Sequence, residues 1–172
     1  DNGRTNFHFE ICADLLNERL LRLLSRARKG LFQFEIGIQS TNPETLIAVN
    51  RKENVYPILY NVEKLLEMGN IHIHVDLIAG LPYETYEIFE RSFNKVYDLG
   101  ADAFQMGFLK VLKGTPLANN IEEYGIVARE RAPYEIISNN WLSSIELAKL
   151  KTVEKMLDIY YNRGGFKRTM AF

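Results

Sequence analysis

Polar side chains that could bind a ligand recur along one face of three predicted strands. Side chains alternate along a strand, so each shared face can be read directly from the sequence. These faces carry His8 and Glu10, then Glu35, Gly37 and Gln39, then His72, His74 and Asp76. For any one strand the polar face could simply meet solvent, but parallel βα units normally bury both sheet faces. Three such faces in succession therefore predict a ligand cavity, with Glu10, Gln39 and Asp76 at the carboxyl ends where α/β ligands bind.

The elements that would position these side chains alternate between strand and helix, which is typical of an α/β protein with a parallel sheet. Strands are predicted at Phe7 to Cys12, Phe32 to Gln39, Ile71 to Ile78 and Ala103 to Leu112. The first helix is predicted to begin at Asp14 and to bury Leu16, Leu20, Leu23, Leu24 and Ala27. Further helices are predicted from Asn42-Pro43, from about Val55 to Gly69, from Thr85 to Leu99, and after a capping box of Ser143 and Glu146.

Length and composition fit one domain with a real core, because the chain has 172 residues of which 47% are hydrophobic. We expect a barrel part over residues 1–124 and a C-terminal extension over residues 125–172, with a short strand near Pro133 to Ser138 and a helix. The net charge of -1 gives no sign of a nucleic-acid or membrane partner. Without an apolar span or signal peptide, a cytoplasmic location is the expectation.

Three stretches of sequence together resemble the radical S-adenosylmethionine (radical SAM) superfamily. They are the run Phe7 to Ile11, the string Gly37-Ile38-Gln39-Ser40 followed by Asn50-Arg51, and the run Asp76 to Thr85. The resemblance covers roughly Phe7 to Leu117 and is to the branch with oxygen-independent coproporphyrinogen oxidases and cobalamin-binding members such as anaerobic magnesium-protoporphyrin ester cyclases. It implies a partial TIM-type barrel made of parallel strands 3 to 6, with helices on the outer face.

The resemblance also implies a binding site for S-adenosylmethionine. Glu10, Gln39 and Asp76 would bind its ribose hydroxyls and amino group, with Ser40 beside them, and Arg51 would pair with its methionine carboxylate. Without the motif, Arg51 would read as a solvated arginine at a helix end. The adenine ring would lie against Ile78 and the backbone of Leu109 and Lys110.

The sequence departs from the family pattern in its iron–sulfur ligands. The CxxxCxxC loop and the GGE segment of the family are absent, and the only cysteine is Cys12. The resemblance therefore implies a fragment that is inactive alone, from an enzyme whose 4Fe-4S cluster is bound by residues outside this chain. The parent enzyme would be an oxidoreductase that reductively cleaves S-adenosylmethionine to a deoxyadenosyl radical. The catalytic residues, the substrate and an upstream cobalamin domain stay open.

Two other interpretations compete with this one. His72 and His74 lie on one strand face, as in metal-dependent hydrolase barrels, where Asp76, Glu10 and Glu35 could supply oxygen ligands. The chain could also be a non-catalytic binding module. As a fragment, it is expected to self-associate through its open sheet edge or its uncovered inner face.

Overall fold

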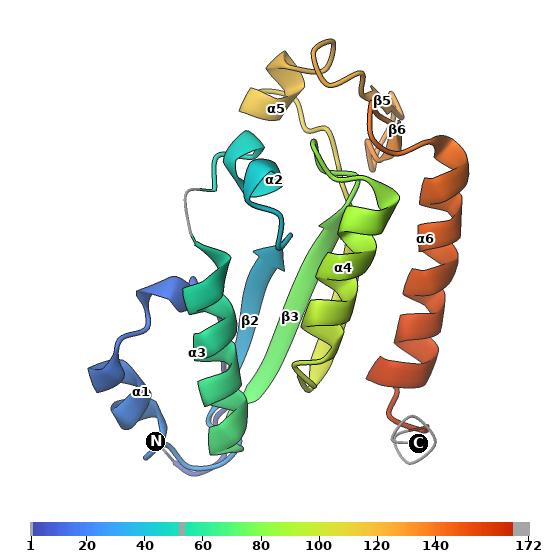
Figure 1. The fold of residues 1–172 in the computed structure, drawn as a ribbon. Coiled ribbons are helices and arrows are strands. Elements are labelled where there is room, and N and C mark those ends of the chain that lie inside the picture. Colours follow the sequence, from blue (N-terminus) through green and yellow to red (C-terminus); the bar gives the residue numbers. More distant parts are fainter. Residues whose placement is uncertain (1, 52–53, 167–172) are drawn as a thin grey trace.

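A computed structural model of the chain describes residues 2–51 and 54–166, and shows one sheet of four parallel strands in the order β1-β2-β3-β4. The strands are β1 (Phe7–Glu10), β2 (Phe32–Gln39), β3 (His72–Ala79) and β4 (Ala103–Phe108). One side of the sheet is covered by α1 (Glu18–Leu24), α3 (Val55–Met68), α4 (Tyr86–Tyr97) and α6 (Ser144–Leu157) (Figure 1). The carboxyl ends of the strands lie near α2 (Pro43–Ala48) and α5 (Pro116–Asn119) (Figure 1).

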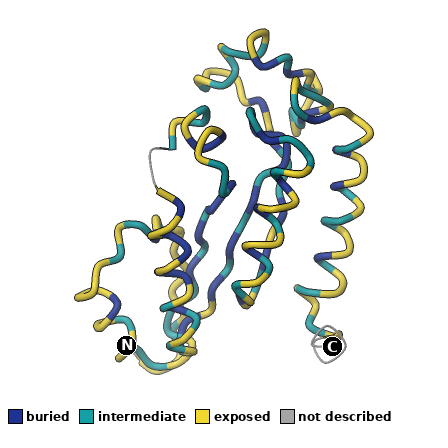
Figure 2. The backbone as a smooth tube through the Cα atoms, in the orientation of Figure 1, coloured by how far each residue is buried: buried dark blue, intermediate teal, exposed yellow. Residues whose placement is uncertain are grey.

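The core lies between the sheet and the helices, and its pattern confirms the alternation predicted for β2 and β3. Every second residue of the two strands is buried, and these side chains face the helices: Phe34, Ile36 and Ile38 on β2, and Ile73, Val75, Leu77 and Ala79 on β3. The residues between them stay partly exposed (Figure 2). The polar face of the sheet is therefore the face without helices.

Most helix ends lie where the sequence predicts them, since the capping side chains are in place. Asn54 and Thr85 accept hydrogen bonds from the first turns of α3 and α4, and Gly69 ends α3 at a φ of 65°. Ser143 and Glu146 form the expected capping box of α6. The loop before α6 pairs the short strands β5 (Val127–Ala128) and β6 (Ile136–Ser138).

The first helix was predicted wrongly. Residues Ala13–Leu15 form a separate 3-10 turn, and α1 begins after Asn17, whose side chain accepts a hydrogen bond from Leu20 N at 3.0 Å. The helix packs through a different face from the predicted one, because Leu21 is buried whereas Leu20 and Leu23 are 40% and 64% exposed. The predicted apolar stripe of the helix is thus only partly correct.

Both edge strands also differ from the prediction. No helix covers β1 within the described residues, so Phe7 and Phe9 remain 43% and 46% exposed although their rings contact Phe32. At the other edge, β4 ends at Phe108 rather than Leu112, because the chain there turns away to pair with the C-terminal extension.

The C-terminal extension packs against β4 and covers its outer edge. The side-chain amide of Asn162, in the π-helical turn η2 (Asp158–Asn162), accepts from Phe104 N at 3.0 Å and donates to Phe104 O at 2.9 Å. Tyr161 donates from its hydroxyl to Ala101 O at 2.6 Å. The last six residues of the predicted extension, 167–172, lie outside the described residues. Among the described helices, none is long and apolar enough to cross a membrane.

Candidate functional site

Three of the predicted site residues converge on one glycine at the carboxyl ends of β2 and β3. Gly37 pairs in register with Asp76, and the Gln39 amide donates to the two Asp76 carboxylate oxygens at 3.2 and 3.3 Å. The Arg51 guanidinium donates to the carbonyl oxygen of Gly37. A Cβ on Gly37 would overlap the Gln39 amide and would lie 3.3 Å from Arg51 Nη2 and 3.4 Å from Asp76 Oδ1. The cluster therefore depends on a residue without a side chain at position 37.

Two left-handed residues bring Gln39 and Arg51 to this cluster. The β2–β3 register shifts between Gly37 and Gln39, and Gln39 has a φ of 67°. At the end of α2, Asn50 has a φ of 58° and the Arg51 amide donates to Leu46 O at 2.8 Å, so that Arg51 turns back toward the sheet. Asparagine is one of the few residues that adopts this conformation readily.

The charge of Asp76 is finely balanced. Burial raises the pKa of Asp76 to about 6, although the Gln39 amide and the Arg51 guanidinium both favour the charged form. Its carboxylate is thus ionised at neutral pH and can accept hydrogen bonds from a ligand. Protonation at mildly acidic pH would remove that ability.

A pocket of about 400 Å³ opens beside the cluster, within the size range of small-molecule sites. Among its lining residues are five of those predicted from the sequence: Gln39, Arg51, Ile78, Leu109 and Lys110. Leu81 and Leu117 add apolar wall, while Gln39 and Arg51 supply polar groups on one side. The donor set and the apolar wall fit a ligand that has both a flat ring and a polar chain, as S-adenosylmethionine has.

Three predicted residues do not line the pocket: Asp76, which contacts the lining residue Gln39, and Glu10 and Ser40. Glu10 is exposed at the end of β1, opposite Glu35 in the strand register. Ser40 is fully buried and faces the helix layer, where its hydroxyl donates to Glu84 Oε1 at 2.5 Å. The structure therefore does not bring Glu10 and Ser40 to the Gly37 cluster, and their roles stay predictions.

Glu84 is a functional candidate to which no role was assigned from the sequence. It is fully buried, and burial raises its pKa to about 7 even though Ser40 and Ser92 donate to it. Its second oxygen, Oε2, has no hydrogen-bond partner among the residues that the structure describes. Thr41 N also donates to Ser92 Oγ, at 3.2 Å, so this carboxyl group joins the end of β2 to α4. Its place in the run Asp76 to Thr85 is the only sequence signal that singles it out.

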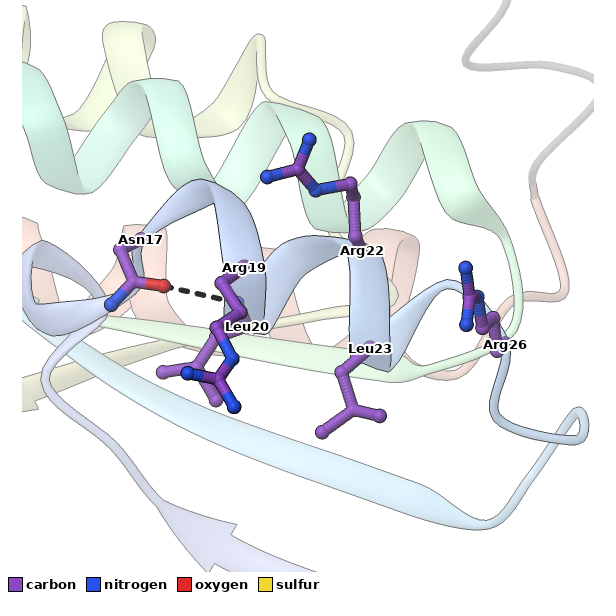
Figure 3. Close-up of a pocket in the computed structure, with 6 residues that line it drawn as sticks. All are labelled: Asn17, Arg19, Leu20, Arg22, Leu23 and Arg26. Atoms are coloured by element: carbon purple, nitrogen blue, oxygen red, sulfur yellow. Dashed lines mark hydrogen bonds between the residues drawn. The ribbon is translucent and has the colours of Figure 1, made fainter.

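A larger hollow, of about 590 Å³, lies on α1 and not at the carboxyl ends of the strands. Its lining comes from α1 and the residues that flank it, namely Asn17, Arg19, Leu20, Arg22, Leu23 and Arg26. Figure 3 shows Arg22 pointing away from the side on which Leu20 and Leu23 lie. A hollow lined by a single helix and its flanking residues cannot surround a ligand. We therefore assign the candidate binding site to the smaller pocket beside Gly37.

The described part of the chain does not favour the rival metal site. His72 is exposed and lies 3.8 Å from Asp102, while His74 lies near Glu35 and burial lowers its pKa. No group of three His, Cys, Asp or Glu side chains among the described residues could hold a metal ion. A 4Fe-4S cluster does not fit this chain either, because the sequence contains one cysteine where the family uses three.

The fold and the pocket define a class: part of an α/β barrel with a pocket at the carboxyl ends of its strands. Residues 1–96 match the Radical SAM superfamily, and residues 122–172 match a family described as Protein of unknown function (DUF4080). The chain belongs to the Radical SAM superfamily.

Characterised relatives agree with this assignment. The chain is 32% identical over 112 residues to tRNA-2-methylthio-N(6)-dimethylallyladenosine synthase of Alkaliphilus oremlandii, covering 63% of the chain and 24% of that protein. It is 31% identical over 101 residues to oxygen-independent coproporphyrinogen III oxidase of Thermostichus vulcanus, covering 56% of the chain and 30% of that protein. The chain thus spans about a quarter to a third of the length of these relatives.

Solved structures show the same fold. Coproporphyrinogen III oxidase (HemN) from Escherichia coli, a radical SAM enzyme, superposes with a TM-score of 0.62 at 21% identity, over 88% of this chain and 32% of that one. The radical S-adenosylmethionine methyltransferase TsrM from Kitasatospora setae, with cobalamin and a [4Fe-4S] cluster bound, gives a TM-score of 0.60 at 17% identity, over 84% of this chain and 29% of that one. The prediction of an α/β fold that is part of a barrel is confirmed.

Proposed function

We propose that this chain forms the wall of a radical SAM enzyme that binds the nucleoside and amino-acid parts of S-adenosylmethionine. The observation that carries the proposal is the convergence of Gln39, Asp76 and Arg51 on Gly37, next to a pocket with apolar walls. The relatives named above are enzymes, which supports an enzymatic role for the protein that contains this chain. Cobalamin in TsrM makes a cobalamin-dependent reaction one candidate among several.

Each residue of the site would have a distinct role. Asp76, ionised at neutral pH, would accept hydrogen bonds from hydroxyl or ammonium groups of the ligand, and Gln39 holds its carboxylate in place. Arg51 would pair with the carboxylate of the methionine part. Ile78 and Leu109 would provide the apolar surface for adenine. Bound S-adenosylmethionine would supply a carbon radical when it is reductively cleaved. The cysteine ligands of the 4Fe-4S cluster that delivers the electron are not in this sequence.

Asp76→Asn tests the proposal directly. The substitution keeps the shape but removes the charge-assisted hydrogen bonds, each of which contributes on the order of 1.5 to 3 kcal/mol, so affinity for S-adenosylmethionine should fall roughly 10- to 150-fold. Equilibrium dialysis with radiolabelled S-adenosylmethionine measures this on the purified chain. Asp98→Asn, at the exposed C-cap of α4, is the matched control. Equal affinities of the two variants would refute the assignment of Asp76.

The same site predicts how binding depends on pH. Because the pKa of Asp76 is about 6 and the ligand needs the ionised form, affinity should be constant above pH 7 and should fall as the pH decreases from 6 to 5. In the Asp76→Asn variant this decrease should be absent.

We also propose that the chain self-associates through β1. This strand pairs only with β2 among the described strands, and Phe7 and Phe9 beside the free edge are about half exposed. Phe9→Lys should shift the monomer–dimer equilibrium toward monomer in sedimentation experiments. Phe166→Lys, at a similarly exposed ring in the C-terminal extension, should leave the equilibrium unchanged. A chain that is monomeric at high concentration would contradict the proposal.

A further inference from the structure

The C-terminal extension hydrogen-bonds to the backbone that forms one wall of the pocket. Beyond β4, Leu109 O accepts from Ile136 N at 2.9 Å, and Val111 N donates to Tyr134 O at 2.9 Å. On the other side Leu109 N donates to Ala79 O at 2.9 Å, at the end of β3. The backbone of residues 109–111 is therefore held between β3 and the extension, and its first two residues line the pocket.

The extension also contacts the turn that follows β3. Asn139 donates from Nδ2 to Gly80 O at 3.0 Å. Gly80 has a φ of 92°, and a Cβ at this position would lie 2.9 Å from a methyl carbon of Ile136. Position 80 therefore requires glycine for two reasons: its left-handed backbone conformation and the close approach of Ile136 from the extension.

The Asn139 side chain has a fixed orientation, and neighbouring rings extend the contact. Its Oδ1 accepts from Trp141 N at 2.9 Å and from Leu142 N at 2.7 Å, which leaves only Nδ2 to reach Gly80. The Trp141 ring lies 4.6 Å from the ring of Tyr83, centroid to centroid. These contacts join the extension to both ends of the segment between Gly80 and Tyr83.

We infer that the extension, which matches a family of unknown function, is a positioning element for the cofactor wall, and that Asn139 is its main positioning residue. Among the described residues, none beyond Leu117 lines the pocket, so the extension acts through the Gly80 turn and the Leu109 backbone. The identity of the ligand rests on the proposed function above. The effect of the extension on the backbone of the Gly80 turn and of Leu109 can be measured without ligand.

Asn139→Asp isolates the contact. The aspartate keeps the acceptor for Trp141 N and Leu142 N but replaces the donor with an oxygen that faces Gly80 O. Asn140→Asp is the matched control, because Asn140 also donates from Nδ2 to a carbonyl, Glu123 O at 3.1 Å, which belongs neither to the Gly80 turn nor to the pocket lining. Hydrogen exchange of the amides of Leu109 and Val111 should accelerate on the order of tenfold in Asn139→Asp only, while the core amides of α3 keep their rates. Unchanged rates at Leu109 and Val111 would overturn the inference.

Ligand binding gives the second readout. Asn139→Asp should weaken binding of S-adenosylmethionine and of adenosine by the same factor, roughly three- to tenfold, because the wall faces the adenine part. Arg51→Lys should weaken binding of S-adenosylmethionine alone. If the wild-type chain binds neither compound, the proposed function fails and the exchange rates alone decide the inference. Asn139→Ser, which keeps an acceptor but cannot reach Gly80, replaces Asn139→Asp if the aspartate variant does not fold.

Discussion

Gly37→Ala should weaken binding of S-adenosylmethionine strongly, and more than Gly107→Ala, the equivalent substitution on β4. The new Cβ would overlap the Gln39 amide and press on Arg51 Nη2 and Asp76 Oδ1, which are 3.3 and 3.4 Å away. Overpacking of this kind costs about 1 to 3 kcal/mol, and here the groups that must move are those that bind the ligand. Affinity should therefore fall roughly 5- to 150-fold.

Gly107→Ala provides a control on β4, in the same sheet. A Cβ at Gly107, which pairs in register with Ile78, would make only ordinary contacts of 3.7 Å with Leu77 O and 3.9 Å with Ile78 Cγ1. Its affinity for S-adenosylmethionine should stay within about twofold of the wild type, since no polar group has to move. Thermal melting of both variants separates a local effect on the pocket from a loss of the fold. Wild-type affinity in Gly37→Ala would show that the cluster does not form the binding site.

Stability should decrease as the pH rises from 4.5 to 7, contrary to the usual behaviour of carboxylates in proteins. Burial raises the pKa of Glu84 from 4.5 in the unfolded chain to about 7 in the folded chain, so the folded state binds more protons between these values. The contribution is fully present below pH 4.5 and is lost as the pH rises through 7. It amounts to about 3 kcal/mol in the free energy of unfolding.

Urea unfolding across this pH range, with Glu84→Gln as the test variant, measures the contribution. The side chain at position 84 of the variant cannot ionise, so the variant should lack the part of the decrease in unfolding free energy between pH 6 and 7 that Glu84 causes in the wild type. Below pH 6 the variant should retain a smaller slope from Asp76, whose pKa is raised to about 6. Glu90→Gln, at an exposed position of α4, should behave like the wild type. An equal slope in Glu84→Gln and wild type between pH 6 and 7 would contradict this role of Glu84.

The sheet could be predicted from the sequence because its period of two is strong and local. β2 alternates between large apolar residues and polar residues or glycine, and this pattern indicates both its bounds and its faces. The start of α1 could not be predicted in this way. Asp14 and Asn17 are both good N-cap residues, and the choice of Asn17 depends on packing around Ala13, where the buried Asn61 amide donates to Ala13 O and Leu16 O.

The site was predictable where it follows strand alternation and not where it depends on burial. Gln39 and Asp76 lie on the polar face, and they contact each other as that face implies. Ser40, one residue further, falls on the opposite face, and its hydroxyl meets Glu84 in the helix layer. The full burial of Glu84 results from the packing of α4 on the sheet, which a local sequence pattern does not contain.

The pairing of Asn162 with Phe104 has a consequence for how the molecule folds. One side-chain amide takes the place that a peptide group of a fifth strand would occupy, and it comes from 58 positions further along the chain. Contacts between such distant residues form late in folding, because a long loop must close first. The last strand of the sheet therefore acquires its final partner only when the C-terminal helix docks, so completion of β4 and docking of the extension are coupled.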